Sequence, residues 1–320
     1  MKKLVLFMTF IVCGLASADA QNYDEYLSVA RRHLAEGNIE SARKAYSVYR
    51  TLSDSRDLSF EEQLGIKSDT SPQPQDFVET TLGLNMKMVY VEGGEFLMGA
   101  TSEQGSDAES NENPVRRVRL DTYYIGECEV TQEQWAKVMG TSIQQRASKE
   151  VLTTCGVGPD YPMYYVSWEE AQVFCQELSR MTGRTYCLPT EAQWEYAARG
   201  GKKADGTKYS GSWSIDAVAW YNDNSGSRTH PVKTKRANGL GLYDMSGNVW
   251  EWCSDWYSSS YNAKDTNNPT GPSTGSKRVL RGGSWGKIAR ICRVSYRDNT
   301  SPDARNAFFE GFGFRVVVIP

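Results

Sequence analysis

The sequence predicts a mixed fold of helices and strands with much irregular backbone, preceded by a short helical hairpin. Apolar residues recur at helical spacing between residues 22 and 54. One strand and three helix starts can be recognised between residues 94 and 193, and no helical period persists beyond Gly200. All nine tryptophans lie between Trp135 and Trp285, which places the aromatic core in the later part of the chain.

The first twenty residues have the pattern of a targeting segment. Two lysines precede an apolar run over residues 4–15 that is too short to span a bilayer, and residues 18–20 form an A-x-A cleavage site. We therefore expect a signal peptide over residues 1–20, a mature chain beginning near Gln21, and a periplasmic or cell-surface location. A lipid anchor at Cys13 is not expected, because the preceding valine is not a small residue. No transmembrane segment is expected in the mature chain.

Charge and metal-ligand composition exclude several classes of function. The chain has 36 basic and 39 acidic residues and no lysine or arginine block after its start, so nucleic acid is not an expected partner. Only His33 and His230 are present, which excludes a multi-histidine iron or zinc site made by this chain alone. The six cysteines after residue 20 form no C-x-x-C motif, although some could pair in an oxidising compartment.

Three regions follow the targeting segment. Residues 21–54 predict two short helices around the break at Gly37-Asn38, either one tetratricopeptide-like hairpin or a hairpin that packs on the main domain. Residues 55–77 are polar, contain two prolines near their end, and are interpreted as a linker. The main domain is expected over residues 78–320.

The main domain contains local signals for specific elements. Residues 94–99 predict a strand after a glycine turn. Capping boxes predict three helix starts, and a tryptophan expected in the core falls in the first turn of each helix. Glycines at the far ends of the first two helices fit C′ positions. These boxes are Thr131/Gln134, Ser167/Glu170 and Thr190/Gln193, the tryptophans are Trp135, Trp168 and Trp194, and the glycines are Gly140 and Gly183.

Several ordered motifs resemble the formylglycine-generating enzyme (sulfatase-modifying factor) family. The longest is the run from Gly239 to Trp252, and the others are residues 94–99, 129–131, 162–168, 188–196, 229–232, 281–285 and 313–315. The resemblance covers roughly residues 78–320. It implies a single α+β domain related to C-type lectin folds, with a small sheet, a few helices and long irregular segments. Such a domain needs buried indoles, a disulfide or a metal ion to hold its loops.

A calcium site is expected in the turn-rich stretch from Asp244 to Glu251. Two carboxylates lie seven residues apart there, and calcium takes six to eight oxygen ligands that a loop can supply. The resemblance implies that the side chains of Asp244 and Glu251 and the carbonyls of Gly247 and Val249 hold the ion. A solvated loop in which the glutamate forms a salt bridge is the alternative.

The resemblance also implies a catalytic centre in which two cysteines bind copper(I), the first three residues after the serine of Gly-Gly-Ser and the second five residues further on. Here Ser284 is that serine, Lys287 replaces the first cysteine, and Cys292 is the second. An ammonium group is no copper(I) ligand, so copper is not expected. Cys292 is then either a remnant catalytic residue or a buried or disulfide-bonded cysteine, with Cys253 as a conceivable sulfur neighbour.

Two functions from different classes remain. The first is an exported non-oxidase that binds a peptide or a glycan, or acts as a scaffold, through a groove beside Ser284, Trp285, Trp250 and Lys287. The alternative is a formylglycine-generating oxidase that converts a sulfatase active-site cysteine, which would rest mainly on analogy of fold. Iron-dependent oxygenation is set aside because the hairpin contributes only one histidine, His33.

Overall fold

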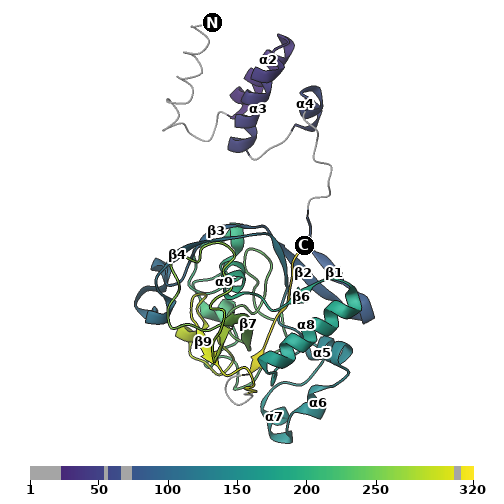
Figure 1. Ribbon diagram of the computed structural model, residues 1–320, viewed down its shortest axis with the longest axis vertical. Helices are drawn as coiled ribbons and strands as arrows, with labels where there is room; N and C mark the ends of the chain where they lie inside the picture. Colours follow the sequence, from purple (N-terminus) through teal and green to yellow (C-terminus); the bar gives the residue numbers. More distant parts are fainter. Residues whose placement is uncertain (1–22, 54–56, 66–73, 306–310) are drawn as a thin grey trace. The chain divides into compact units, whose positions relative to one another are not determined.

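The structure is a computed structural model that describes residues 23–53, 57–65, 74–305 and 311–320 (Figure 1). The expected signal peptide over residues 1–20, including Cys13, lies outside the described residues. The chain divides into two compact units, Met1–Gln73 and Pro74–Pro320. Among the helices of the described residues, none combines the length and the apolar character needed to cross a membrane.

Unit 1 contains the expected helical hairpin. Helices α2 (Tyr23–Ala35) and α3 (Ile39–Ser53) pack together around a turn in which Gly37 has φ 74°. The segment interpreted as a linker differs from expectation, because it contains helix α4 (Leu58–Gln63). Phe60 and Leu64 enter the core formed by Ala30, Ala42 and Tyr46, so this segment completes the core of the unit.

The three expected capping boxes begin three helices of unit 2. Each hydroxyl accepts a hydrogen bond from the backbone N–H three residues on, and each residue at that position reaches back to the cap. Helices α5 (Gln132–Met139) and α8 (Trp168–Thr182) end at the left-handed glycines Gly140 and Gly183, and α9 (Glu191–Arg199) ends at Gly200. Helices α6 (Ile143–Arg146) and α7 (Lys149–Thr154) were not expected.

Trp135 and Trp194 are fully buried as predicted, whereas Trp168 is half-buried. Figure 1 shows α5 and α8 side by side, and the Trp135 ring stacks on Phe174 of α8 with ring centroids 5.7 Å apart. The helices therefore bury one common apolar face against the strands.

Three sheets complete unit 2 and confirm the α+β class. The five-stranded sheet has the order β1-β2-β5-β11-β6, the four-stranded sheet has the order β10-β7-β8-β9, and β3 pairs with β4. The bounds are β1 (Phe77–Glu79), β2 (Met86–Val91), β3 (Gly94–Met98), β4 (Arg116–Leu120), β5 (Tyr123–Gly126), β6 (Tyr186–Cys187), β7 (Trp250–Trp256), β8 (Arg278–Arg281), β9 (Asp298–Thr300), β10 (Phe312–Gly313) and β11 (Val317–Val318). The main difference from expectation is strand β7, because a strand begins directly after the turn that contains the carboxylates.

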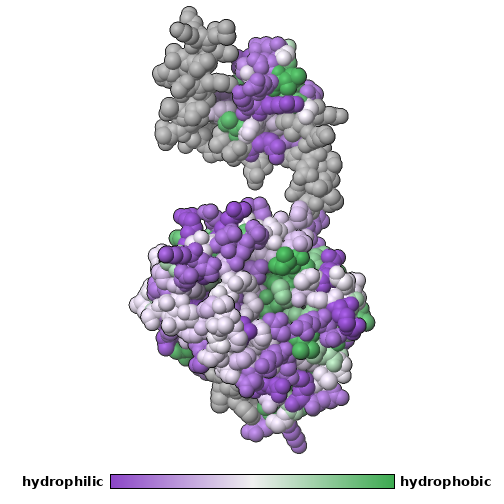
Figure 2. Space-filling model, viewed as in Figure 1, coloured by the Kyte–Doolittle hydropathy of each residue, from purple (hydrophilic) through white to green (hydrophobic). Residues whose placement is uncertain are grey.

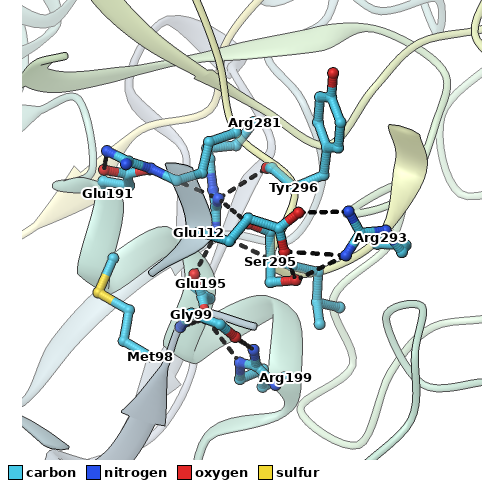
Figure 3. A network of polar contacts seen from close by, with 12 residues as sticks. Met98, Gly99, Glu112, Glu191, Glu195, Arg199, Arg281, Arg293, Ser295 and Tyr296 are labelled. Atoms are coloured by element: carbon cyan, nitrogen blue, oxygen red, sulfur yellow. Dashed lines mark hydrogen bonds and ion pairs between the residues drawn. The ribbon is translucent and has the colours of Figure 1, made fainter. Parts of the chain in front are cut away.

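Buried arginine–glutamate pairs hold the irregular segments between residues 280 and 320. Each pair joins a late arginine to a glutamate of an earlier element, and Figure 3 shows part of this network. The pairs are Arg281–Glu195, Arg293–Glu112, Arg297–Glu191 and Arg315–Glu251, at N···O distances of 2.5 to 2.6 Å. Buried pairs tie loops together only when their remaining hydrogen bonds are satisfied, and carbonyl oxygens accept several of the remaining arginine protons here.

The surface of unit 2 on the face seen in Figure 2 is mostly hydrophilic, with hydrophobic residues scattered in small groups. Scattered apolar residues are normal on a protein surface and do not by themselves mark an interface.

Candidate functional site

The loop over residues 244–251 is fixed by backbone contacts to two distant segments. The Gly247 and Asn248 N–H groups donate to the carbonyls of Gly282 and Trp220, each at 2.8 Å, and the Trp285 N–H donates to the Asn248 carbonyl at 2.8 Å. Gly247 has φ 81°, and a Cβ atom there would lie 2.2 Å from the Trp220 carbonyl oxygen. Only glycine therefore allows this crossing.

A group of buried carboxylates surrounds the loop. Glu129 accepts hydrogen bonds from the Val249 N–H at 3.2 Å and from the Asn248 side chain at 3.1 Å. Burial raises the pKa of Asp244 to about 6, and burial with the neighbouring Asp244 and Glu251 carboxylates raises that of Glu129 well above its usual range. Carboxylates outnumber their cationic neighbours here, an imbalance that a bound cation would relieve.

The predicted calcium ligands fit a cation only in part. Asp244 Oδ2 accepts from the Lys233 N–H at 2.8 Å, while its buried Oδ1 has no hydrogen-bond partner in the described part of the chain. Glu251 forms the salt bridge that was the alternative expectation, since Arg315 donates to both of its oxygens at 2.6 and 2.8 Å and Trp194 donates at 2.8 Å. Among the described residues, no three His, Cys, Asp or Glu side chains gather as metal ligands.

The segment from Gly282 to Cys292 packs tightly against itself. Gly283 has φ 74°, and a Cβ atom there would lie 2.6 Å from Cys292 Sγ, so glycine makes room for the sulfur. The Ser225 hydroxyl donates to the Trp285 carbonyl at 2.9 Å, and the Asn222 N–H donates to the Lys287 carbonyl at 3.0 Å. The backbone of Lys287 is thus held by the loop at residues 222–225.

Cys292 is a buried free thiol. It is fully buried among Tyr209, Ile215 and Val218, and burial raises the pKa of its thiol to about 12 despite the Ser284 backbone N–H and the Lys287 ammonium, which lower it. No disulfide joins any two described cysteines, and Cys253 lies in a different apolar cluster. Of the two structural interpretations of Cys292, the structure therefore supports a buried cysteine and not a disulfide-bonded one.

The aromatic groove expected beside Ser284 is not formed by the predicted residues. Ser284, Trp285 and Trp250 are all buried, and both indoles belong to the main apolar cluster. The physical reason is that Trp250 begins β7, whose first four residues are all buried, so that both faces of the strand are covered there. Lys287 is half-buried, and the neighbouring Ile288 is 48% exposed.

A cavity of about 200 Å³ lies at the far end of β7. Its lining includes Asp255, Trp256, Glu191, Arg297 and Arg116. Sequence reasoning missed this site because its members come from four separate segments. The only signal was the dense run of charged and aromatic residues that begins at Trp250.

Comparison with known proteins supplies the family. Residues 73–319 match the family described as the sulfatase-modifying factor enzyme 1-like domain. The chain belongs to this family. The match spans unit 2 and extends over most of the chain, which confirms the expected resemblance.

The relatives of this chain are named for different functions. The chain is 33% identical to the formylglycine-generating enzyme of Streptomyces coelicolor, over 71% of this chain and 87% of that protein. It is 31% identical to the chaperone protein LppX of Paenibacillus barcinonensis, over 65% of this chain and 82% of that protein. Among solved structures, Treponema denticola variable protein 1 is 33% identical with a TM-score of 0.67, covering 78% of this chain and all of that one. Family membership therefore does not by itself decide between catalysis and another role.

Proposed function

We propose that this protein is an exported, non-oxidase member of the sulfatase-modifying factor family that binds a peptide or a glycan or acts as a scaffold. The observation that carries the proposal is the pair Lys287 and Cys292. A lysine occupies the position of one copper ligand in the family pattern, and the remaining thiol is buried and strongly disfavours its thiolate. Copper(I) prefers thiolate ligands, so neither residue offers what the metal requires.

The surface beside Lys287 supports binding rather than oxidation. Ile288, the residue after Lys287, is 48% exposed. The next residue, Ala289, packs against the apolar cluster that contains Cys292. An exposed apolar side chain next to a half-buried ammonium offers contact area with one polar anchor, which suits an extended ligand.

Copper titration tests the proposal. The purified protein and its Lys287→Cys variant are titrated with copper(I) under anaerobic conditions and then incubated in air with a cysteine peptide. Mass spectrometry follows conversion of the peptide cysteine to the aldehyde, with the Streptomyces coelicolor enzyme as positive control.

We expect weak copper binding and no aldehyde with the natural protein. The Lys287→Cys variant should gain copper affinity, because it places two soft ligands in the family positions. Stoichiometric copper binding and aldehyde formation by the natural protein would overturn the proposal in favour of the oxidase. Equal copper affinity in the two proteins would show that position 287 does not decide the chemistry.

Export and calcium binding are further parts of the proposal. The lysine-led apolar run and the cleavage site before Gln21 support export, and N-terminal sequencing of the protein recovered outside the cytoplasm tests it. The buried Asp244 Oδ1 and the nearby Glu129 support calcium. The side chain of Asp244 and the carbonyls of Gly247 and Val249 would hold the ion. The side chain of Glu251 would also contact the ion while it keeps its salt bridge to Arg315. Bound calcium would neutralise the carboxylates and fix the loop.

A further inference from the structure

The cavity at the end of β7 contains a buried carboxylate with an acceptor to spare. Asp255 is buried, and its Oδ2 accepts from the Glu191 N–H at 2.8 Å and from the Ser254 hydroxyl at 3.1 Å. No described residue donates a hydrogen bond to Oδ1. Because Asp255 lines the cavity, a ligand inside can donate a hydrogen bond to this oxygen.

The charges around the cavity nearly cancel. Arg297 donates to both oxygens of Glu191 at 2.6 and 2.8 Å. Arg116 donates to the carbonyls of Asn262 and Asp265, each at 2.8 Å, and forms no ion pair among the described residues. The lining therefore holds two guanidinium groups and three carboxylates, those of Glu191, Asp255 and Asp265, and a strongly charged ligand would gain little there.

The rest of the lining combines an aromatic side chain with small polar groups. The half-buried Trp256 lines the cavity with Pro272, Ser258 and Ser260, and the Arg278 guanidinium lies 3.4 Å from the centroid of the indole ring. A volume of about 200 Å³ accommodates one small ring rather than a length of peptide. An indole, hydroxyl groups and a carboxylate together suit a ligand with a hydrophobic face and several hydroxyl groups.

We infer that this cavity binds a neutral, polyhydroxylated ligand of the size of one sugar ring, with Asp255 accepting hydrogen bonds from its hydroxyl groups. The inference deepens the proposed binding function by naming a ligand class and a second site, which shares no residue with the surface around Lys287. The copper titration tests the absence of oxidase chemistry separately, so either proposal can fail while the other stands.

Saturation-transfer NMR on the purified protein tests the inference, with the methyl glycosides of glucose, galactose, mannose and N-acetylglucosamine as probes. Glucuronate and glucosamine serve as charged comparisons. Three variants accompany the natural protein. Asp255→Asn keeps an oxygen for the Glu191 N–H and removes the charge, and Ser260→Trp fills the exposed rim. Ser259→Trp is the matched control, because Ser259 is exposed next to Ser260 but does not line the cavity.

We expect at least one neutral glycoside to bind, with affinity reduced roughly tenfold or more by Asp255→Asn and lost in Ser260→Trp. Ser259→Trp should bind as the natural protein does. Absence of saturation transfer from every neutral sugar would overturn the inference. It would equally be overturned by binding that Asp255→Asn and Ser260→Trp leave unchanged, or by exclusive binding of the charged sugars.

Discussion

Replacing Arg293 with methionine tests what holds the loops of unit 2 in place. The Arg293 guanidinium is fully buried and donates to both carboxylate oxygens of Glu112, at 2.5 and 3.0 Å. It also donates to Gln104 at 3.0 Å and to the Arg290 carbonyl at 2.7 Å (Figure 3 shows the pair with Glu112). Methionine keeps the apolar stem and removes these donors, and so leaves Glu112 buried without its counterion.

The expected loss of unfolding free energy is about 3–5 kcal/mol, the usual cost of breaking a buried ion pair from one side. The matched control is Arg290→Met, three residues earlier. Arg290 pairs with Glu109 at 2.9 Å, and the two side chains are 49% and 34% exposed. An exposed pair of this kind contributes about 0–1 kcal/mol.

The dependence on pH adds a second readout. Burial alone would raise the pKa of Glu112, but the hydrogen bonds and charge of Arg293 with the Ser295 hydroxyl hold it below its ordinary value of 4.5. A lowered pKa stabilises the fold above pH 4.5, and this stability is lost as the pH falls through the folded-state pKa. The difference in unfolding free energy between the natural protein and Arg293→Met should therefore be largest at neutral pH and become smaller towards pH 4.

Urea unfolding followed by tryptophan fluorescence measures the effect, because all nine tryptophans lie in unit 2. Adding Glu112→Gln to Arg293→Met should restore part of the loss by removing the stranded charge. A loss below about 1 kcal/mol in Arg293→Met, or one equal to that of Arg290→Met, would refute the reasoning.

Three further predictions follow from buried groups. Burial raises the pKa of Asp255 from 3.8 to about 7, so the stability of the natural protein should fall by up to about 4 kcal/mol between pH 4 and pH 8. In urea unfolding, the unfolding free energy of Asp255→Asn should depend less on pH than that of the natural protein. The same pH dependence in both proteins would contradict the assignment of this effect to Asp255. Millimolar calcium should raise the melting temperature by about 5 °C over a chelated sample, and Asp244→Asn should abolish the shift in a thermal melt. Cys292 should resist iodoacetamide in the folded state at pH 8, since a thiol of pKa about 12 is thiolate in roughly one molecule in ten thousand. Rapid labelling of Cys292, located by peptide mapping, would contradict this prediction and show that the thiol is accessible.

Local signals predicted local structure well. A capping box occupies four consecutive residues, and its hydrogen bonds form as soon as the helix does. The start of α8 at Ser167 could therefore be identified from the sequence, and the positive φ of Gly183 requires no distant partner either. The hairpin of unit 1 was similarly identified from spacing and one glycine turn.

Long-range partners could not be predicted in this way. Arg293 and Glu112 are 181 residues apart, and Arg297 and Glu191 are 106 apart, so no spacing rule connects them. The predicted groove failed for a related reason. Trp250 is expected beside an open groove, but it begins a strand whose first four residues are all buried, so its indole lies in the core.

The fold tolerates lysine at position 287 because the hydrogen bond from Asn222 involves the backbone at that position, and Cys292 forms no disulfide with another described cysteine. The Lys287 and Trp285 carbonyls are held by Asn222 and Ser225, and Cys292 occupies space that Gly283 leaves open. A lysine at position 287 keeps all of these contacts, because they involve the backbone. The fold of this segment therefore does not depend on a cysteine at position 287, which agrees with the proposed non-oxidase function. Under that proposal the fixed loops serve binding, whereas oxidation would need a second thiolate that position 287 does not supply.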